Sequence, residues 1–286
     1  MPPGKAPAGD GGVDDRLGDL PDEVLQHILG FLPAQEAVQT CVLARRWRHL
    51  WKSVATLCIT SWDWKKEVSM ETKFMHFVHR LLLHRRRAPM DKFDLNLSGG
   101  DTRLVSIWFR TAMMCQARVI RLNIINSWGS QPELDNLNLP VVSRHLAKLQ
   151  LSGVKLMQSF LNFSSCPVLE HLEIFNFKMY WQRCPTFSKL KTLFISVCIS
   201  AILDCEALSC ILRHSPVLEN LTLQFHRMEF RQKGKVEMIG SYSHMEKSSA
   251  ISEQLKIVAI QCDEIDDQII KVLKFLSTFS IRKLTS

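Results

Sequence analysis

A leucine pattern that recurs along most of the chain constrains the fold more than any other feature of the sequence. The pattern is Leu-x-x-Leu-x-Leu, and its clear, loose and partial copies occupy residues 93–97, 119–124, 146–151, 169–174, 190–195, 218–223 and 255–260. The final apolar positions of successive copies are 27, 27, 23, 21, 28 and 37 residues apart. Intervals of about 20–29 residues are typical of leucine-rich repeats. The pattern therefore predicts a solenoid of short parallel strands whose leucines point inward, with an insertion in the last interval.

The segments between these strands are expected to return as helices or as irregular chain. Apolar residues at helical spacing predict helices over 102–115 and 202–212. Residues 224–252 are polar, basic and poor in leucine, so we expect a loop or a distorted repeat there. From residue 252 onward the pattern predicts strand, turn and helix, and the helix has an apolar face over 265–276. A terminal unit of this kind would cover the open end of the solenoid.

A second apolar segment, residues 20–51, precedes the repeats. Pro21 and Pro33 each stand where a helix can start, and apolar residues recur at three- and four-residue steps after both. A third apolar stripe, over 44–54, is interleaved with arginines. We therefore expect three short helices with more apolar surface than so small a unit can bury alone. Such a unit is either a cap packed on the domain that follows or a docking module for a partner protein.

The same segment resembles the F-box, in the form common in plants. The resemblance rests on Leu20-Pro21, Glu23, Val24-Leu25, Ile28-Leu29, Leu32-Pro33 and the run Val42-Leu43-Ala44-Arg45-Arg46-Trp47-Arg48. Two preludes to repeats, Cys166-Pro-Val-Leu-Glu-His-Leu and Ser215-Pro-Val-Leu-Glu-Asn-Leu, are similar to the leucine-rich repeat that accompanies plant F-boxes. The resemblance implies that the chain binds the Skp adaptor of a cullin-RING ubiquitin ligase and has no catalytic chemistry of its own.

Together these features predict an α/β chain, with a short three-helix F-box followed by a leucine-rich-repeat solenoid that has a curved parallel sheet. The expected divisions are a disordered tail over 1–15, the F-box over 16–54, a helical connector over 55–92, the repeats over 93–251 and a terminal unit over 252–286. The terminal unit resembles the FBD module of some plant F-box proteins, and a plain capping repeat explains the same residues. The connector carries a basic cluster at residues 84–87.

The cysteine content indicates the kind of cellular compartment in which the protein is expected. The nine cysteines include no repeated Cys-x-x-Cys pair. Several lie in apolar contexts, as buried free thiols do: Cys58, Cys115, Cys166, Cys198 and Cys262. This usage favours a reducing compartment, and the sequence shows neither an apolar signal region nor a run long enough to span a membrane. We therefore expect a cytoplasmic or nuclear protein with no membrane partner.

The sequence offers no catalytic constellation, phosphate-binding loop or complete metal site. His76 and His79 are three residues apart on a predicted helix, but two histidines without a third ligand make a weak metal site. The net charge of +8 permits an acidic partner, yet no basic–aromatic motif supports nucleic-acid binding. We expect no enzyme activity, no cofactor, no metal and no nucleic-acid partner.

Two surfaces are candidate binding sites. The predicted adaptor-binding residues are Leu20, Pro21, Val24, Leu25, Ile28, Leu29, Trp47, Leu50 and Trp51, some of which must instead hold the helices together. The predicted target-binding residues flank the strand leucines on the concave face: Arg121, Asn123, Lys148, Gln150, His171, Glu173, Phe175, Thr192, Phe194, Asn220 and Thr222. The leading hypothesis is a substrate-recognition subunit of an SCF-type ubiquitin ligase. The alternative is a leucine-rich-repeat interaction scaffold in which the F-box-like helices serve only as a cap.

Overall fold

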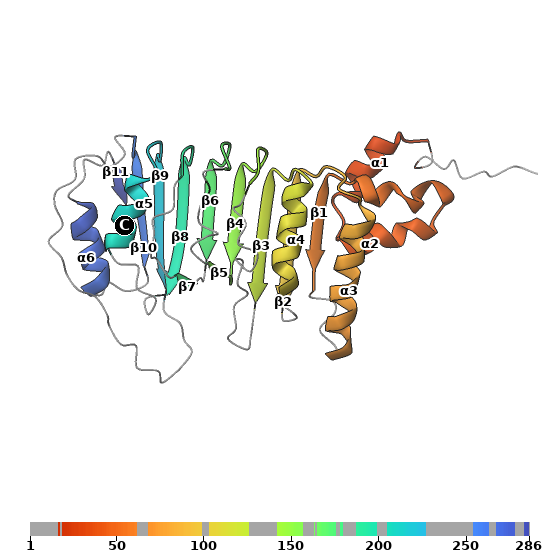
Figure 1. The fold of residues 1–286 in the computed structure, drawn as a ribbon, viewed down its shortest axis with the longest axis horizontal. Helices are drawn as coiled ribbons and strands as arrows, with labels where there is room; N and C mark the ends of the chain where they lie inside the picture. The colour runs from red at the N-terminus through yellow and green to blue at the C-terminus, as the bar shows by residue number, and fades with distance from the viewer. Residues whose placement is uncertain are drawn as a thin grey trace, which may run out of the picture.

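The computed structural model of the chain describes residues 17, 19–61, 68–98, 103–125, 142–156, 163, 165–175, 178–179, 187–198, 205–226, 254–262, 267–277 and 283–285. The disordered tail predicted over 1–15 lies outside these ranges, as does nearly all of the insertion predicted over 224–252. The repeats, the N-terminal helical segment and the terminal helix lie largely within them (Figure 1).

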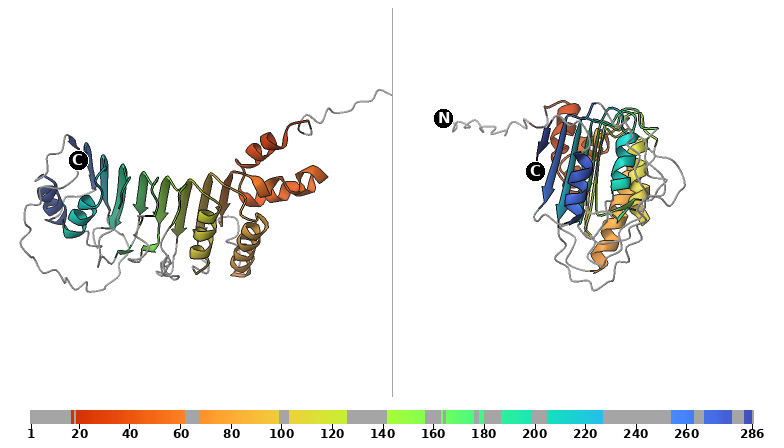
Figure 2. Two further views of the ribbon diagram at one scale, coloured as in Figure 1. Left: turned by 45° about the horizontal axis from the view of Figure 1, so that its top comes forward. Right: turned by 90° about the vertical axis from the view of Figure 1, so that its left-hand side faces the viewer.

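A parallel sheet runs the length of the molecule, and its strands follow one another in chain order. The strands are β1 (Thr56–Thr60), β2 (Lys92–Ser98), β3 (Val119–Ile125), β4 (Lys148–Ser152), β6 (His171–Phe175), β8 (Thr192–Cys198), β9 (Asn220–His226), β10 (Ile257–Cys262) and β11 (Lys283–Thr285). A separate short pair joins β5 (Lys155–Leu156) and β7 (Lys178–Met179). Figures 1 and 2 show the curved ladder that results, which confirms the predicted solenoid.

The strand register explains why the leucine pattern repeats. Each strand pairs with its neighbour so that one inward apolar position continues across the sheet. The middle apolar residue of the first two copies lies in the same row as the final apolar residue of every later copy. The resulting row is 3% exposed or less throughout: Leu95, Leu122, Leu151, Ile174, Ile195, Leu223 and Ile260. Because alternate side chains of a strand point to opposite faces, every copy contributes its leucines to one continuous core.

Helices cover the core side of the sheet. They are α3 (Val68–His84), α4 (Arg103–Met114), α5 (Cys205–Arg213) and α6 (Asp267–Leu276). Figure 2 shows α3, α4 and α5 on the same face of the sheet, and α6 contacts α5 at the C-terminal end of the ladder. The helices predicted over 102–115, 202–212 and 265–276 are therefore present, within the ranges described.

The connector predicted as helical over 55–92 differs from the structure at its start. Helix α3 lies within it, but residues 56–60 form β1, which pairs in parallel with β2. The sequence Thr-Leu-Cys-Ile-Thr alternates buried and half-buried side chains, as a strand on a sheet face does. The leucine pattern could not reveal this strand, because β1 contains one leucine and is held by pairing with β2.

The N-terminal helical segment contains two α-helices, α1 (Asp22–Leu29) and α2 (Ala34–Gln39), each directly preceded by a proline as predicted. The third helix predicted over 44–54 is present as short 3-10 helices and not as one continuous helix. That stretch forms two 3-10 turns, η2 (Arg45–Arg48) and η3 (Leu50–Ser53), separated at His49, and a further turn, η1 (Thr40–Val42), precedes them.

This N-terminal segment shares one hydrophobic core with the solenoid. Leu25, Leu50 and Trp51 are buried in the same cluster as Leu57 of β1 and Phe93 of β2. Contacts of α2 with β1 also place the segment against the first strand of the sheet (Figure 1). The helical segment therefore seals the N-terminal end of the ladder, where an open edge would expose core residues.

Arg85 connects α3 to this junction. It was expected in a solvated basic cluster at 84–87, but it is only 2% exposed. Its Nη1 donates to the carbonyl oxygen of Trp51 at 3.2 Å, and its Nη2 donates to that of Val54 at 2.8 Å. Burial lowers the pKa of the Arg85 guanidinium from its ordinary value. One buried cation thus satisfies two carbonyl groups at the end of the N-terminal segment.

The glutamates of the two Pro-Val-Leu-Glu preludes link neighbouring repeats. The Glu170 carboxylate accepts a hydrogen bond from Lys191 Nζ at 2.8 Å, and Glu219 pairs with Lys256 at 3.0 Å. The hydrogen bond between Glu170 and Lys191 lowers the pKa of the Glu170 carboxyl and raises the pKa of the Lys191 ammonium. All four residues directly precede strands, so these pairs occupy equivalent positions at one edge of the sheet.

Five cysteines are free thiols in the described part of the chain: Cys41, Cys58, Cys115, Cys166 and Cys262. Burial raises the pKa of the Cys115 and Cys166 thiols, as expected for thiols in apolar surroundings. Cys210 differs from the expectation of free thiols, since it takes part in a disulfide. None of the helices within the described ranges combines the length and the apolar character that crossing a bilayer requires.

Candidate functional site

Helix α1 places a row of apolar side chains in solvent. Val24, Ile28 and Phe31 follow one another at steps of four and three residues, so they lie along one side of α1 and the turn after it, beside the face that buries Leu25 and Leu29. Their exposed fractions are 41%, 38% and 76%. The edge of His27 packs against Phe31, with ring centroids 5.0 Å apart. An aromatic ring this exposed on a small helical unit is typical of a surface that a partner covers.

A second apolar pair follows η1. Val42 and Leu43 are 82% and 68% exposed, and with Phe31 they are the most exposed large apolar side chains in the described part of the chain. Val42 is the last residue of η1, and Leu43 follows it directly. No residue of η1 is buried, so this turn does not pack its side chains into the core. Among the described residues, the three most exposed large apolar side chains therefore all lie in the N-terminal segment.

An arginine fixes the position of α1 relative to η2. Arg46 pairs with Asp22 at 2.7 Å, and it also donates a hydrogen bond to the carbonyl oxygen of Leu20. Both charged side chains are partly exposed, so the pair contributes little stability. Its effect is to hold the start of the exposed helix against the arginine-rich turn.

The structure divides the predicted adaptor-binding residues into two groups. Pro21, Val24 and Ile28 are exposed, and Leu20 and Trp47 are partly buried against the core. The remaining four are corrected, because they are at most 8% exposed and hold the segment to itself and to β1: Leu25, Leu29, Leu50 and Trp51. A side chain this buried offers no surface to a partner without unfolding.

Sequence reasoning left Phe31, Val42 and Leu43 out of the predicted site. Phe31 was detectable, since it falls beside the apolar stripe that the sequence carries from Val24 to Leu32 and not on it. Val42 and Leu43 lie in the segment that carries the family resemblance, but their exposure depends on the 3-10 turns that replace a regular helix.

Comparison with known proteins identifies this segment. An F-box domain model matches residues 17–59, which includes all of the exposed apolar residues described above. The chain is also 29% identical over 221 residues to the F-box/LRR-repeat protein At3g59200 of Arabidopsis thaliana, covering 73% of this chain. The chain contains an F-box domain, and along most of its length it is similar to plant F-box/LRR-repeat proteins.

Two further similar proteins come from the same plant. The F-box/LRR-repeat proteins At3g26922 and At3g59190 of Arabidopsis thaliana are 30% and 27% identical to this chain, over 58% and 90% of its length. The chain spans 36%, 61% and 58% of the lengths of At3g59200, At3g26922 and At3g59190. The F-box match ends at residue 59, so it also takes in most of β1.

The outward face of the sheet, opposite the helices, holds the predicted target-binding residues. All eleven alternate with buried core positions and are half-buried themselves: Arg121, Asn123, Lys148, Gln150, His171, Glu173, Phe175, Thr192, Phe194, Asn220 and Thr222. The register aligns Arg121, Gln150, Glu173, Phe194 and Thr222 in one row across five strands. Their placement follows from strand alternation, and their binding role stays a prediction.

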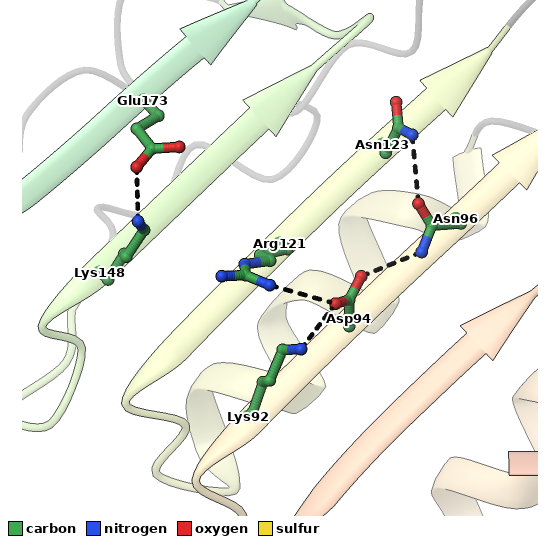
Figure 3. A network of polar contacts seen from close by, with 7 residues as sticks. All are labelled: Lys92, Asp94, Asn96, Arg121, Asn123, Lys148 and Glu173. Carbon is green, nitrogen blue, oxygen red and sulfur yellow. Dashed lines mark hydrogen bonds and ion pairs between the residues drawn. The ribbon is translucent and has the colours of Figure 1, made fainter. Parts of the chain in front are cut away.

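A network of polar contacts occupies the N-terminal half of this face (Figure 3). Asp94 lies at its centre and accepts hydrogen bonds or ion pairs from Lys92 at 2.9 Å and from Asn96 at 3.0 Å. Asn96 in turn accepts a hydrogen bond from Asn123 at 3.1 Å. Residues Phe93–Leu97 are the predicted first strand, and its alternation already places Asp94 and Asn96 on the outward face. Lys92, Asp94 and Asn96 are nevertheless absent from the predicted target-binding residues.

Aromatic side chains continue the face beyond the polar network. Phe175 of β6 and Phe194 of β8 pack with their ring centroids 4.8 Å apart. Next to them, Nδ1 of His171 and Oγ1 of Thr192 share a hydrogen bond of 2.7 Å. A shallow depression of about 340 Å³ lies between the two regions, lined by Asp94, Asn96, Arg121, Leu122, Asn123, Gln150, Ser152 and Phe175.

Within the described ranges, no three His, Cys, Asp or Glu side chains gather where they could hold a metal ion. His76 and His79 are both exposed on α3. The two surfaces carry different groups: exposed apolar side chains on the F-box, and amide, hydroxyl, charged and aromatic side chains on the sheet.

Proposed function

We propose that this chain is a substrate-recognition subunit of an SCF-type ubiquitin ligase, in which the F-box binds the Skp adaptor and the repeats bind a target protein. The observation that carries the proposal is the exposure of Phe31, Val42 and Leu43 within the F-box match. Apolar side chains this exposed on a small helical unit are stabilised when a partner buries them.

Such a subunit acts by proximity and needs no catalytic residue of its own. The target held on the repeats is brought to a ubiquitin-carrying enzyme that the assembly supplies, which raises the effective concentration of the reacting groups. The shared core and Arg85 support this role, because they join the F-box to the first strand without a mobile linker. Five free thiols favour a cytoplasmic or nuclear location, in which the disulfide of Cys210 would be an exception.

Co-purification with a plant Skp adaptor tests the proposal. The wild-type chain should bind the adaptor stoichiometrically, and Phe31→Ser combined with Val42→Ser should weaken binding about tenfold or more, since two buried apolar contacts are lost. The double substitution Leu20→Ala with Pro21→Ala should also abolish binding, because it disturbs the start of α1. The matched control is Leu83→Ser, which removes a 63% exposed leucine from α3 outside the F-box and should bind normally.

The scaffold hypothesis remains the second candidate, and the sealing of β1 by the F-box helices favours it. A cap needs no adaptor. A folded wild-type chain that fails to bind the adaptor would therefore reject the ligase subunit and leave the scaffold. Full adaptor binding by the Phe31/Val42 variant would instead show that the exposed apolar face is not the docking surface.

A further inference from the structure

The Arg121 guanidinium on the outward face is incompletely paired. Its Nη1 is 3.8 Å from Oδ2 of Asp94, beyond hydrogen-bond distance, and the Lys92 ammonium already contacts the same oxygen at 2.9 Å. Its Nε is buried and has no hydrogen-bond partner. A guanidinium carries five N–H donors in a planar fork, so most of the donor capacity of Arg121 is unused beside the depression.

Neighbouring carboxylates do not supply the missing partner. Glu173, on the strand after next, pairs with Lys148 at 2.5 Å (Figure 3). Three cations and two carboxylates make up this network, which leaves one positive charge uncompensated: Lys92, Arg121, Lys148, Asp94 and Glu173. The contacts assign that charge to Arg121, whose nearest ion pair is the longest of the set.

An apolar surface lies within reach of the same depression. Phe175 lines it, and Phe194 packs on the far side of Phe175. Arg121 is on β3 and Phe175 is on β6, with β4 between them. Neighbouring strands are about 4.8 Å apart, and Phe175 lies two residues farther along β6 than Glu173, the residue in register with Arg121, so the two side chains arise about 12 Å apart on the sheet. An extended peptide that crosses the strands covers this distance in about three to four residues.

We propose that the depression binds an acidic side chain of the target protein through Arg121, with an apolar or aromatic target residue about three positions away on Phe175 and Phe194. The inference rests on the proposed function, since it describes the target that the repeats select. Arg121 donates two N–H groups to the carboxylate in the bidentate geometry that guanidinium groups favour. Gln150 and Ser152 line the floor and offer hydrogen bonds to the peptide backbone.

Charge favours a carboxylate over a phosphate as the occupant. The network has one uncompensated positive charge, which a carboxylate neutralises. A phosphate group carries nearly two negative charges near neutral pH, and Asp94 lies close enough to Arg121 to repel the second. The site therefore takes Asp or Glu in a protein segment.

Selection from a random dodecapeptide library displayed on phage tests the inference, with the chain in complex with its adaptor as bait. We expect selected peptides to share Asp or Glu about three positions from Phe, Leu, Trp or Tyr. A synthetic copy of the best peptide should lose about tenfold or more in affinity when Gln replaces its acid, and also when the bait carries Arg121→Gln or Phe175→Ser. The matched control, Arg213→Gln, removes an exposed arginine from α5 and should bind normally.

Several outcomes would overturn the inference: no enriched peptide, an enriched motif without an acid, or affinity unchanged by Arg121→Gln. A peptide with phosphoserine that binds tighter than its acidic parent would overturn the choice of a carboxylate. Adaptor binding is measured on the same preparations. Peptide selection that fails while adaptor binding is intact rejects this inference alone, and adaptor binding that fails rejects the proposed function.

Discussion

Replacing Arg85 with methionine tests how the F-box is joined to the repeats. Methionine has a similar length and suits a buried site, but it cannot donate hydrogen bonds. The substitution leaves the carbonyl oxygens of Trp51 and Val54 without their donors. The neighbouring Arg86 is exposed, and it also lies in the left-handed region with a φ of 46°. Arg86→Met is therefore a matched control one residue away.

The expected cost follows from these contacts. Each buried carbonyl that loses its partner costs about 1–3 kcal/mol, so two cost about 2–6 kcal/mol. Removing a buried charge whose Nε has no partner recovers part of this, about 1–2 kcal/mol. We expect a net loss of about 2–4 kcal/mol in the free energy of unfolding. Arg85→Lys keeps the charge but not the fork, so it should cost less than methionine does.

Urea unfolding followed by far-UV circular dichroism measures this loss. With a urea dependence of about 2 kcal/mol per molar, the midpoint of Arg85→Met should fall by about 1–2 M, whereas Arg86→Met should leave it unchanged. Hydrogen exchange should show the loss first at Leu50–Ser53, next to the two carbonyl groups. An Arg85→Met midpoint equal to that of the wild type would refute the reasoning, and so would an equal shift in Arg86→Met.

Two further predictions concern the repeats. Gly153→Ala should destabilise the fold by about 2–4 kcal/mol in thermal unfolding. The reason is that Gly153 has a φ of 68° and an added Cβ would lie 1.9 Å from the carbonyl oxygen of Ile124. Gly30 has an ordinary helical conformation, so Gly30→Ala should cost far less, and equal losses would contradict this argument. Glu170→Gln should make the free energy of unfolding depend less on pH in the acidic range. The pKa of Glu170 is lowered in the folded chain by Lys191, so its contribution is present above its unfolded pKa and is lost as pH falls through the folded value. The difference in unfolding midpoint between wild type and variant should therefore shrink from pH 7 toward pH 3, and a constant difference would count against the pair.

The strands and helices of the repeats could be predicted because their signals are local. Leu122, Leu151 and Ile174 alternate with polar residues within each strand, and the same spacing recurs in every copy. The register then follows, since each strand must place its leucines in the shared core. The outward positions of Arg121 and Phe175 follow from the same alternation.

Other features depend on contacts between distant segments, and the sequence does not carry them locally. Strand β1 exists because β2 offers it a pairing edge. Arg85 reads as one member of a solvated basic cluster, and only the carbonyl groups more than thirty residues earlier make its burial favourable. The roles within α1 were inseparable for a related reason. Val24 and Leu25 are both apolar, and the orientation of the helix against η3 decides which one is buried.

The sealing of β1 by the F-box has a consequence for how such chains can be cut and recombined. The F-box is both the N-terminal cap of the solenoid and the proposed docking module. An exchange of F-boxes between two proteins of this kind would therefore replace both at once. A fusion junction placed after β1 transfers the cap together with the strand that it covers. A fusion junction at residue 54 instead separates Leu57 from the Leu50 and Trp51 side chains that share its core. Compatible F-boxes should therefore be those whose inner faces match the first strand, whatever partner their outer faces bind.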